Sequence, residues 1–211
     1  MGYPTKEGPV QGLYALKPWY SRRLSRIVRL AVDRGISPDA FTMLGICGAV
    51  LAAGCVALGW WLPALLMLGV RLGGANLDGA VARARGVSRP WGFVLNEIGD
   101  RSSDLIVFGG LFVLATRTAG MTSAPAVLVA VAAAAASLPT AASLAAAGAG
   151  ATRRNGGPFG KTERCLAMVV AAAFPAALGW VCVVVVAGSL LTAAVRLLAA
   201  HRELTEQAAP A

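Results

Sequence analysis

Charged side chains are scarce in this sequence, and so are the side chains that bind zinc. Charged residues make up 14% of the 211 residues and hydrophobic residues 57%, whereas about a quarter of the residues in a soluble domain are charged. The sequence has one histidine, and its four cysteines lack the close spacing of a disulfide framework or a zinc site. The composition therefore predicts an integral membrane protein and excludes an ordinary soluble domain.

Positive charge exceeds negative charge, with 19 Lys and Arg against 10 Asp and Glu. A net charge of +9 is also found in nucleic-acid-binding domains. Here, however, the basic residues flank apolar segments and form no separate domain, a placement that fits anionic lipid headgroups and cytoplasmic loops. We therefore expect membrane lipids, and no nucleic acid, as partners.

Six apolar segments have about the length of 20 residues that a helix needs to cross the hydrocarbon core. They cover residues 37–58, 61–83, 92–116, 123–149, 162–179 and 181–200. Before them, residues 17–34 carry Leu24, Ile27, Val28 and Ala31 at helical spacing, opposite arginines. This pattern predicts an amphipathic helix lying on the membrane surface, and an ordinary basic leader is the alternative.

The predicted fold is an all-α integral membrane protein with six transmembrane helices preceded by an N-terminal interfacial helix. Residues 1–36 form the leader with the interfacial helix, residues 37–200 the membrane domain, and residues 201–211 a tail. Lys and Arg gather in the connections on one side of the membrane, and only Arg117 falls in a connection on the other. The positive-inside rule then places both termini in the cytoplasm, and we expect a bacterial plasma membrane.

Four acidic side chains interrupt the apolar pattern. Asp78, Glu97, Asp100 and Asp104 lie between apolar runs, where an ionised carboxylate is unfavourable unless it is paired or binds a metal. At about 100° per residue, the last three share one helical face with Asn96. Hard oxygen ligands without histidine or cysteine favour magnesium, manganese or calcium over zinc. This segment is therefore the candidate functional site.

Two features of the same segment have a second interpretation. Arg71, Arg83 and Arg101 would neutralise the acids as structural ion pairs, although buried pairs barely repay their desolvation. Small residues at 73–75, 79, 80 and 82 would either let two membrane helices pack closely or open a cavity for a bulky polar group. The sequence alone leaves these alternatives open.

The spacing of the polar residues resembles a family signature. Asp78-Gly79-x-x-Ala82-Arg83 is followed by eight residues, Gly92, three residues, Asn96, three residues and Asp100. This is similar to the pattern of the CDP-alcohol phosphotransferases, Asp-x-x-Asp-Gly-x-x-Ala-Arg, eight residues, Gly-x-x-x-Asp-x-x-x-Asp. The segments SPDAFT at 37–42 and GPFGKTER at 157–164 are similar to two further segments of that family. The first acid of the pattern falls on Ala75 and the third on Asn96.

The resemblance implies a membrane enzyme of phospholipid synthesis, with residues 37–200 as its catalytic domain. Such an enzyme transfers a phosphoalcohol group from a CDP-alcohol, such as CDP-diacylglycerol, to an acceptor hydroxyl and releases CMP. The donor would be a CDP-linked lipid or alcohol, and the acceptor a small alcohol or a sugar phosphate. A homodimer is expected from the family alone.

The resemblance also implies the cofactor, Mg²⁺ or Mn²⁺, and its ligands, since in the family the four acids of the pattern hold two divalent cations. Asp78, Asn96 and Asp100 would bind metal, and Glu97 or Asp104 would restore the charge that the pattern loses. Asp100 would also be the catalytic residue, as the general base that takes the acceptor proton.

The implied substrate contacts involve two groups of residues. Asp78 would bind the nucleotide, Gly79 and Ala82 would allow its close approach, and Arg83 would lie near a phosphate. A basic group would surround an anionic acceptor or headgroup, and consists of Arg153, Arg154, Lys161 and Arg164. The alternative role of this second group is to set the membrane orientation.

Two other classes of function compete with an enzyme. A non-catalytic relative that binds a nucleotide-lipid would explain Ala75 and Asn96. A small ion-coupled transporter would use Asp78 and the acids at 97–104 as an ion relay, although the sequence lacks the inverted repeats and broken helices typical of transporters. Release of CMP from a CDP-alcohol separates the three.

Overall fold

The computed structural model describes residues 5–6 and 17–208, and that part of the chain is almost entirely helical. Its helices are α1 (Lys17–Asp33), α2 (Pro38–Ala57), α3 (Trp61–Ala84), α4 (Pro90–Ala119), α5 (Ala124–Gly148), α6 (Lys161–Ala173), the short 3-10 helix η2 (Pro175–Ala177) and α7 (Leu178–Ala208). Two-residue strands, β1 (Thr5–Lys6) and β2 (Arg153–Arg154), pair in parallel. The all-α prediction is confirmed for the described residues.

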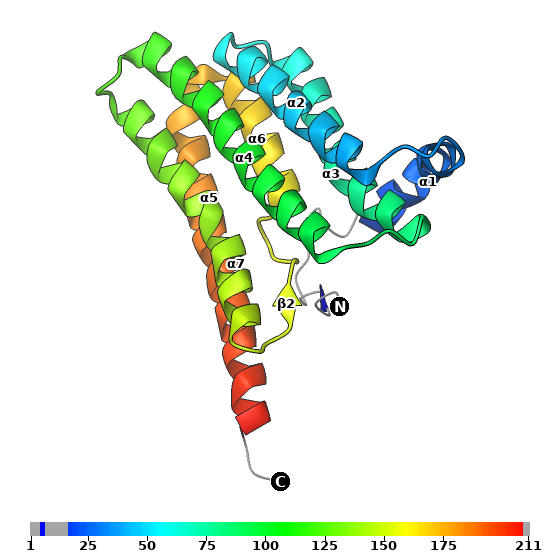
Figure 1. Ribbon diagram of the computed structural model, residues 1–211. Coiled ribbons are helices and arrows are strands. Elements are labelled where there is room, and N and C mark those ends of the chain that lie inside the picture. The colour runs from blue at the N-terminus through cyan, green and yellow to red at the C-terminus, as the bar shows by residue number, and fades with distance from the viewer. Residues whose placement is uncertain (1–4, 7–16, 209–211) are drawn as a thin grey trace.

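The helices pack around one large apolar core. Helix α2 contacts α3 and α4, and α5 runs along α7 on another side of the bundle (Figure 1). Buried apolar side chains come from every long helix after α1, for example Ala52, Leu68, Phe108, Val129 and Cys182. In a membrane such packing is driven by close contact and not by exclusion of water, so small residues are expected where helices touch.

Helices α2 and α3 touch through glycines, and this contact positions the candidate site. A Cβ added at Gly74 would lie 2.6 Å from the backbone nitrogen of Gly45 and 2.6 Å from the carbonyl oxygen of Phe41. The two backbones are therefore too close for any larger residue. The small residue at 74 serves helix packing, and the close approach brings Thr42 of α2 against Asp78, one turn further along α3.

Among the described residues, four helices are long and apolar enough to cross a membrane: Pro38–Ala57, Trp61–Ala84, Ala124–Gly148 and Pro175–Ala208. The six predicted spans all contain helices, but six crossings are not confirmed. Helix α6 has only 13 residues, fewer than the about 20 that a crossing needs. It ends at Ala173, because Phe174 precedes Pro175 and the residue before a proline avoids helical geometry.

A helix forms where the interfacial helix is predicted. On α1, Leu24 and Val28 pack against a small core that contains Leu77 and Val81 of α3. Ile27, on the same face, is 43% exposed. Part of the apolar face is thus covered by protein, and the location of α1 on the membrane surface stays a prediction.

Three polar parts of the molecule lie at the same end of the bundle. They are α1, the connection at 85–89 between α3 and α4, and the connection at 149–160 that carries β2 (Figure 1). The opposite connections, at 58–60 and 120–123, are short. This arrangement agrees with the side assigned from Lys and Arg, while the orientation in the membrane stays a prediction.

Candidate active site

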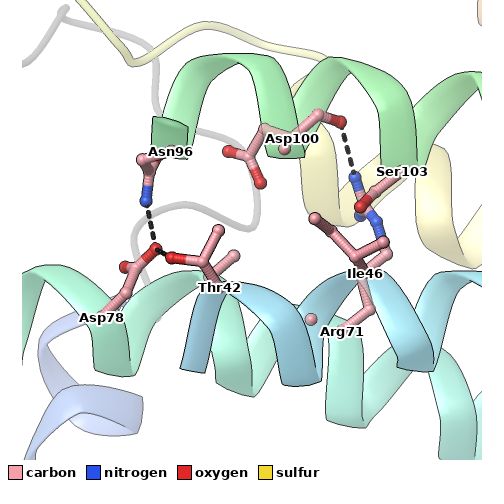
Figure 2. A pocket seen from close by; sticks show the side chains of 10 residues that line it. Thr42, Ile46, Arg71, Asp78, Asn96, Asp100 and Ser103 are labelled. Carbon is pink, nitrogen blue, oxygen red and sulfur yellow. Dashed lines mark hydrogen bonds between the residues drawn. The ribbon is translucent and has the colours of Figure 1, made fainter. Parts of the chain in front are cut away.

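Two neighbouring cavities contain most of the predicted site residues. The smaller one lies between α4 and the pair α2 and α3, and Figure 2 shows the carboxylates of Asp78 and Asp100 pointing into it from opposite sides. The larger one has a volume of about 430 Å³ and extends toward α6, α7 and the connection at 149–160. Ala75 and Asp100 line both cavities, so the two adjoin at these residues.

Asp78 is buried and held by hydrogen bonds alone. Its Oδ2 accepts from Thr42 Oγ1 at 3.0 Å and from Asn96 Nδ2 at 2.5 Å, and its Oδ1 accepts from the backbone nitrogen of Gly79 at 2.5 Å (Figure 2). The side chain forms no ion pair with the described part of the chain, and the residue is 5% exposed. Three donors fix the orientation of the carboxylate, and no cationic side chain of the described residues takes up its charge, so Asp78 is available to bind a positive ligand.

Asp100 forms an ion pair with a lysine. Lys161 Nζ donates to both carboxylate oxygens of Asp100, at 2.6 and 2.7 Å. Lys161 is the first residue of α6, whose start is fixed because the backbone nitrogen of Gly160 donates to Glu163 Oε2 at 2.9 Å. The start of α6 therefore places one positive charge on the acid that both cavities share.

Asp104 forms ion pairs with three arginines. Arg71 forms an ion pair with its Oδ1, and Arg101 and Arg164 reach its Oδ2 at 3.1 and 3.0 Å. Arg71 is 1% exposed and also donates to the backbone carbonyl of Asp100 at 3.4 Å. One carboxylate thus holds three guanidinium groups, which leaves an excess of positive charge beside the cavities.

Glu97 and Arg153 form an ion pair in the larger cavity. Arg153 belongs to β2, and its guanidinium also lies 4.8 Å from the centre of the Phe93 ring. Next to it, Glu203 of α7 accepts from the backbone nitrogen of Thr152 at 2.9 Å and from Arg154 Nη2 at 2.8 Å. The end of α7 thereby anchors the strand that supplies Arg153.

The structure brings some predicted residues together and separates others. Asp78, Asn96 and Asp100 face the smaller cavity, and Arg153, Lys161 and Arg164 line the larger one. Glu97 and Asp104 do not line the smaller cavity and form ion pairs with arginines. The ion-pair interpretation therefore holds for Asp104, with Arg71 and Arg101.

The predicted site residues that follow Asp78 on α3, Gly79, Ala82 and Arg83, line neither cavity. A Cβ added at Gly79 would lie 3.1 Å from Arg83 Nη1, so the arginine folds back over the glycine. Arg83 is exposed and Ala82 half-buried. Their predicted contacts with nucleotide stay predictions, as does a contact of Arg154 with the acceptor, since Arg154 pairs with Glu203.

Two residues of the site were missed from the sequence. Thr42 donates to Asp78, and its position in the segment SPDAFT was a usable signal. Arg196 of α7 lines the larger cavity and donates to the carbonyl oxygens of Gly156, Pro139 and Asn155, at 2.9, 2.7 and 2.6 Å. A buried arginine inside an apolar helix is a signal of the same kind as a buried acid.

The oxygen atoms around the smaller cavity fit one divalent cation. Asp78, Asp100, the amide oxygen of Asn96 and the hydroxyl of Thr42 are hard ligands, and Mg²⁺ is commonly bound through one or two carboxylates while it keeps several waters. A second cation is not supported, because Ala75 offers a methyl group where the pattern has an acid. In the described part of the chain no three His, Cys, Asp or Glu side chains are grouped as a metal site.

The comparisons with known proteins agree with the motif. No family model matches the sequence. The chain is 36% identical over 100 residues to the inner membrane protein YnjF of Escherichia coli, covering 47% of this chain and 48% of that protein. It is 36% identical over 95 residues to a phosphatidylinositol phosphate synthase of Mycobacterium marinum, covering 44% of this chain and 40% of that protein. These matches span less than half the length of either relative.

A solved structure has the same fold over nearly the whole chain. Phosphatidylinositol phosphate synthase (PgsA1) of Mycobacterium tuberculosis with CDP-DAG bound superposes with a TM-score of 0.74 at 23% identity, covering 90% of this chain and 99% of that one. The same enzyme in complex with manganese and citrate gives 0.72, covering 89% and 93%. Together with the sequence relatives, this fold confirms the resemblance to the CDP-alcohol phosphotransferase family.

Proposed function

We propose that the chain transfers a phosphoalcohol group from a CDP-alcohol, such as CDP-diacylglycerol, to an acceptor hydroxyl in phospholipid synthesis and releases CMP. The observation that carries the proposal is the placement of Asp78 and Asp100, the two matching acids of the motif, around one cavity. The adjoining larger cavity has room and positive charge for a phosphorylated substrate. The CDP-DAG bound to PgsA1, which shares the fold, supports a CDP-linked lipid as donor.

The smaller cavity, of about 10 Å³, would hold a divalent cation, and the pyrophosphate of the donor would lie next to it in the larger cavity. Asp78, Asn96 and Asp100 would bind Mg²⁺ or Mn²⁺, as the manganese complex of PgsA1 also suggests. The bound cation would neutralise charge on the pyrophosphate. Thr42 fixes Asp78 by its hydrogen bond, so the carboxylate is oriented before substrate arrives.

Asp100 would take the proton of the acceptor hydroxyl at its carboxylate. The ammonium of Lys161 donates to both carboxylate oxygens of Asp100 and would hold this side chain in position, and a general base must be within hydrogen-bond reach of the proton that it takes. The position of Asp100 between the two cavities would let it meet an acceptor bound in the larger one.

The larger cavity would bind the acceptor. Arg153, Lys161 and Arg164 line it, together with Arg196. Guanidinium groups match phosphate oxygens in pairs, so we expect a small alcohol that carries a phosphate group, such as a sugar phosphate. Both termini and this cavity would face the cytoplasm, where such acceptors are found.

The non-catalytic alternative is favoured by one observation. Asn96 donates its amide hydrogen to Asp78, which stabilises the carboxylate without metal. A chain that binds the donor and does not turn it over would use the same residues.

The test is release of CMP by the purified protein in detergent. The assay contains CDP-diacylglycerol, Mn²⁺ and a panel of acceptors, including inositol 1-phosphate and glycerol 3-phosphate. We expect CMP release with at least one phosphorylated acceptor, and a loss of 10²–10⁴-fold in Asp100→Asn, as is typical when a general base is removed. Asp100→Asn with more than about a tenth of the activity would exclude the base assignment. Donor binding without any CMP release would favour the non-catalytic alternative.

A further inference from the structure

Lys161 lies near Ala75, the position at which the family pattern has its first acid. Ala75, Asp100 and Lys161 all line the larger cavity. The methyl group of Ala75 stands where the family pattern has its first acid, and the ammonium of Lys161 contacts both oxygens of Asp100 in the same space. Next to Asp100, the chain therefore lacks the negative charge that an acid at position 75 would supply and has the positive charge of Lys161.

The charges around the two cavities leave room for one divalent cation. Asp78 and Asp100 are the acids facing the smaller cavity, whereas Asp104 and Glu97 are already paired with arginines. A first cation at Asp78 would be matched by these two carboxylates. A second cation at Asp100 would lie beside the ammonium of Lys161 without any further carboxylate, and like charges at such distances repel strongly where water is scarce.

The fold fixes the backbone from which the Lys161 side chain extends. Lys161 opens α6, and the chain just before it is fixed because the backbone nitrogen of Phe159 donates to Thr192 Oγ1 of α7 at 3.0 Å. The side chain of Lys161 is 22% exposed. The contact of Lys161 with Asp100 therefore starts from a backbone position that α7 fixes.

We propose that Lys161 supplies the second positive charge of this site, so that the chain binds one divalent cation where four acids would bind two. The single cation lies at Asp78, Asn96 and Asp100, and the ammonium takes the place of the other on Asp100. The inference rests on the proposed function only for the presence of a cation. It makes Lys161 a positioning residue that also adjoins the phosphate-binding arginines of the larger cavity.

The experiment is a titration of the purified protein with Mn²⁺ alone, followed by calorimetry and by the electron paramagnetic resonance signal of free Mn²⁺. We expect one Mn²⁺ per chain in the native protein. We also expect one in Ala75→Asp, because Lys161 still occupies Asp100. Ala75→Asp combined with Lys161→Gln should bind two, and the matched control, Ala75→Asp combined with Lys161→Arg, should bind one.

The single substitution Lys161→Gln is a second measure that needs no added acid. Removing a positive charge next to Asp100 should tighten binding of the one Mn²⁺ at least about tenfold, since a neighbouring charge changes ion affinity by this much or more. Lys161→Arg should leave the affinity within about threefold of the native value, because it keeps the charge.

Several outcomes would overturn the proposal. These are two cations or none in the native protein, two in Ala75→Asp with Lys161 in place, one in the Ala75→Asp, Lys161→Gln protein, or an unchanged affinity in Lys161→Gln. The titration contains no donor or acceptor, so its failure leaves the proposed transfer to the CMP assay. Absence of CMP release with the expected numbers of cations would instead reject the transfer and keep the role of Lys161.

Discussion

The side-chain amide of Asn96 on α4 donates a hydrogen bond of 2.5 Å to Oδ2 of Asp78 on α3. The amide bridges two helices at the position where the family pattern has an acid. A carboxylate at 96 would face the carboxylate of Asp78 and repel it unless a cation lay between them. Asparagine therefore keeps the site stable without metal and gives up one charged ligand.

Asn96→Asp should make the stability of the protein depend on metal. Without metal we expect a loss of about 1 to 3 kcal/mol, because Asp78 loses its donor and gains a like charge. With Mn²⁺, a third carboxylate should tighten binding on the order of tenfold. The thermal unfolding midpoint in EDTA and in MnCl₂ measures both effects.

Asn76→Asp is the matched control for this substitution. Asn76 also lies on α3 near the site, but its amide donates to the carbonyl oxygen of Leu72 at 2.6 Å and not to Asp78. It should not tighten Mn²⁺ binding. Equal tightening by both substitutions would mean that the site responds to net charge alone and that Asn96 is not a ligand.

Asp104→Asn should destabilise the protein strongly. Arg71 is almost fully buried and loses the carboxylate that neutralises it, and an uncompensated buried charge costs about 3–5 kcal/mol. Asp39→Asn serves as the control, since Asp39 pairs with Arg89 at 2.5 Å on an exposed surface, where a pair contributes about 0–1 kcal/mol. Thermal unfolding of both variants in one detergent makes the comparison. Similar midpoints would contradict a structural role for the Asp104 cluster.

The sequence predicted which polar residues lie together around the smaller cavity because its signals there are local. Asn96 and Asp100 lie one turn apart on one helix, and the helix limits at 38–57, 61–84 and 124–148 are within one residue of the predicted spans. The partners of Glu97 and Asp104 were not predictable in this way. Arg153 and Arg164 come from 56 and 60 residues further along the chain, and only the packing of α6 and of the connection at 149–160 decides which acid each one meets.

The fifth predicted span shows a different limit of the sequence pattern. Residues 162–179 are apolar enough to suggest a crossing, but Phe174 leaves helical geometry before Pro175. Hydrophobicity averaged over a window does not register a single backbone restriction. The same averaging is the reason that Arg196 was missed, because it lies in an apolar run. In the structure its guanidinium donates to three carbonyl oxygens from distant segments.

Glu203→Gln should weaken acceptor binding more than it slows the chemical step. Glu203 accepts from Thr152 and from Arg154, and so fixes the strand that carries Arg153 into the larger cavity. Loss of the charge should raise KM for the acceptor several-fold and leave kcat within about threefold, because the reacting groups are untouched. Glu206→Gln, an exposed position on the same helix, should change neither constant. A fall in kcat without a change in KM would contradict this positioning role.

The orientation of the chain decides whether substrates can reach the site. The connections at 85–89 and 149–160 lie at the same end of the bundle (Figure 1), and the second of them lines the larger cavity. Both carry basic residues that favour the cytoplasm. With the four native cysteines replaced, a cysteine at Ser88 should be shielded from an impermeant thiol reagent in intact cells. A cysteine at Thr122, equally exposed on the other side, should be labelled readily. Both should react after the cells are opened, which controls for burial. Labelling at Ser88 in intact cells would mean that this end of the bundle faces the outside of the cell. The proposed reaction with a cytoplasmic acceptor would then be excluded.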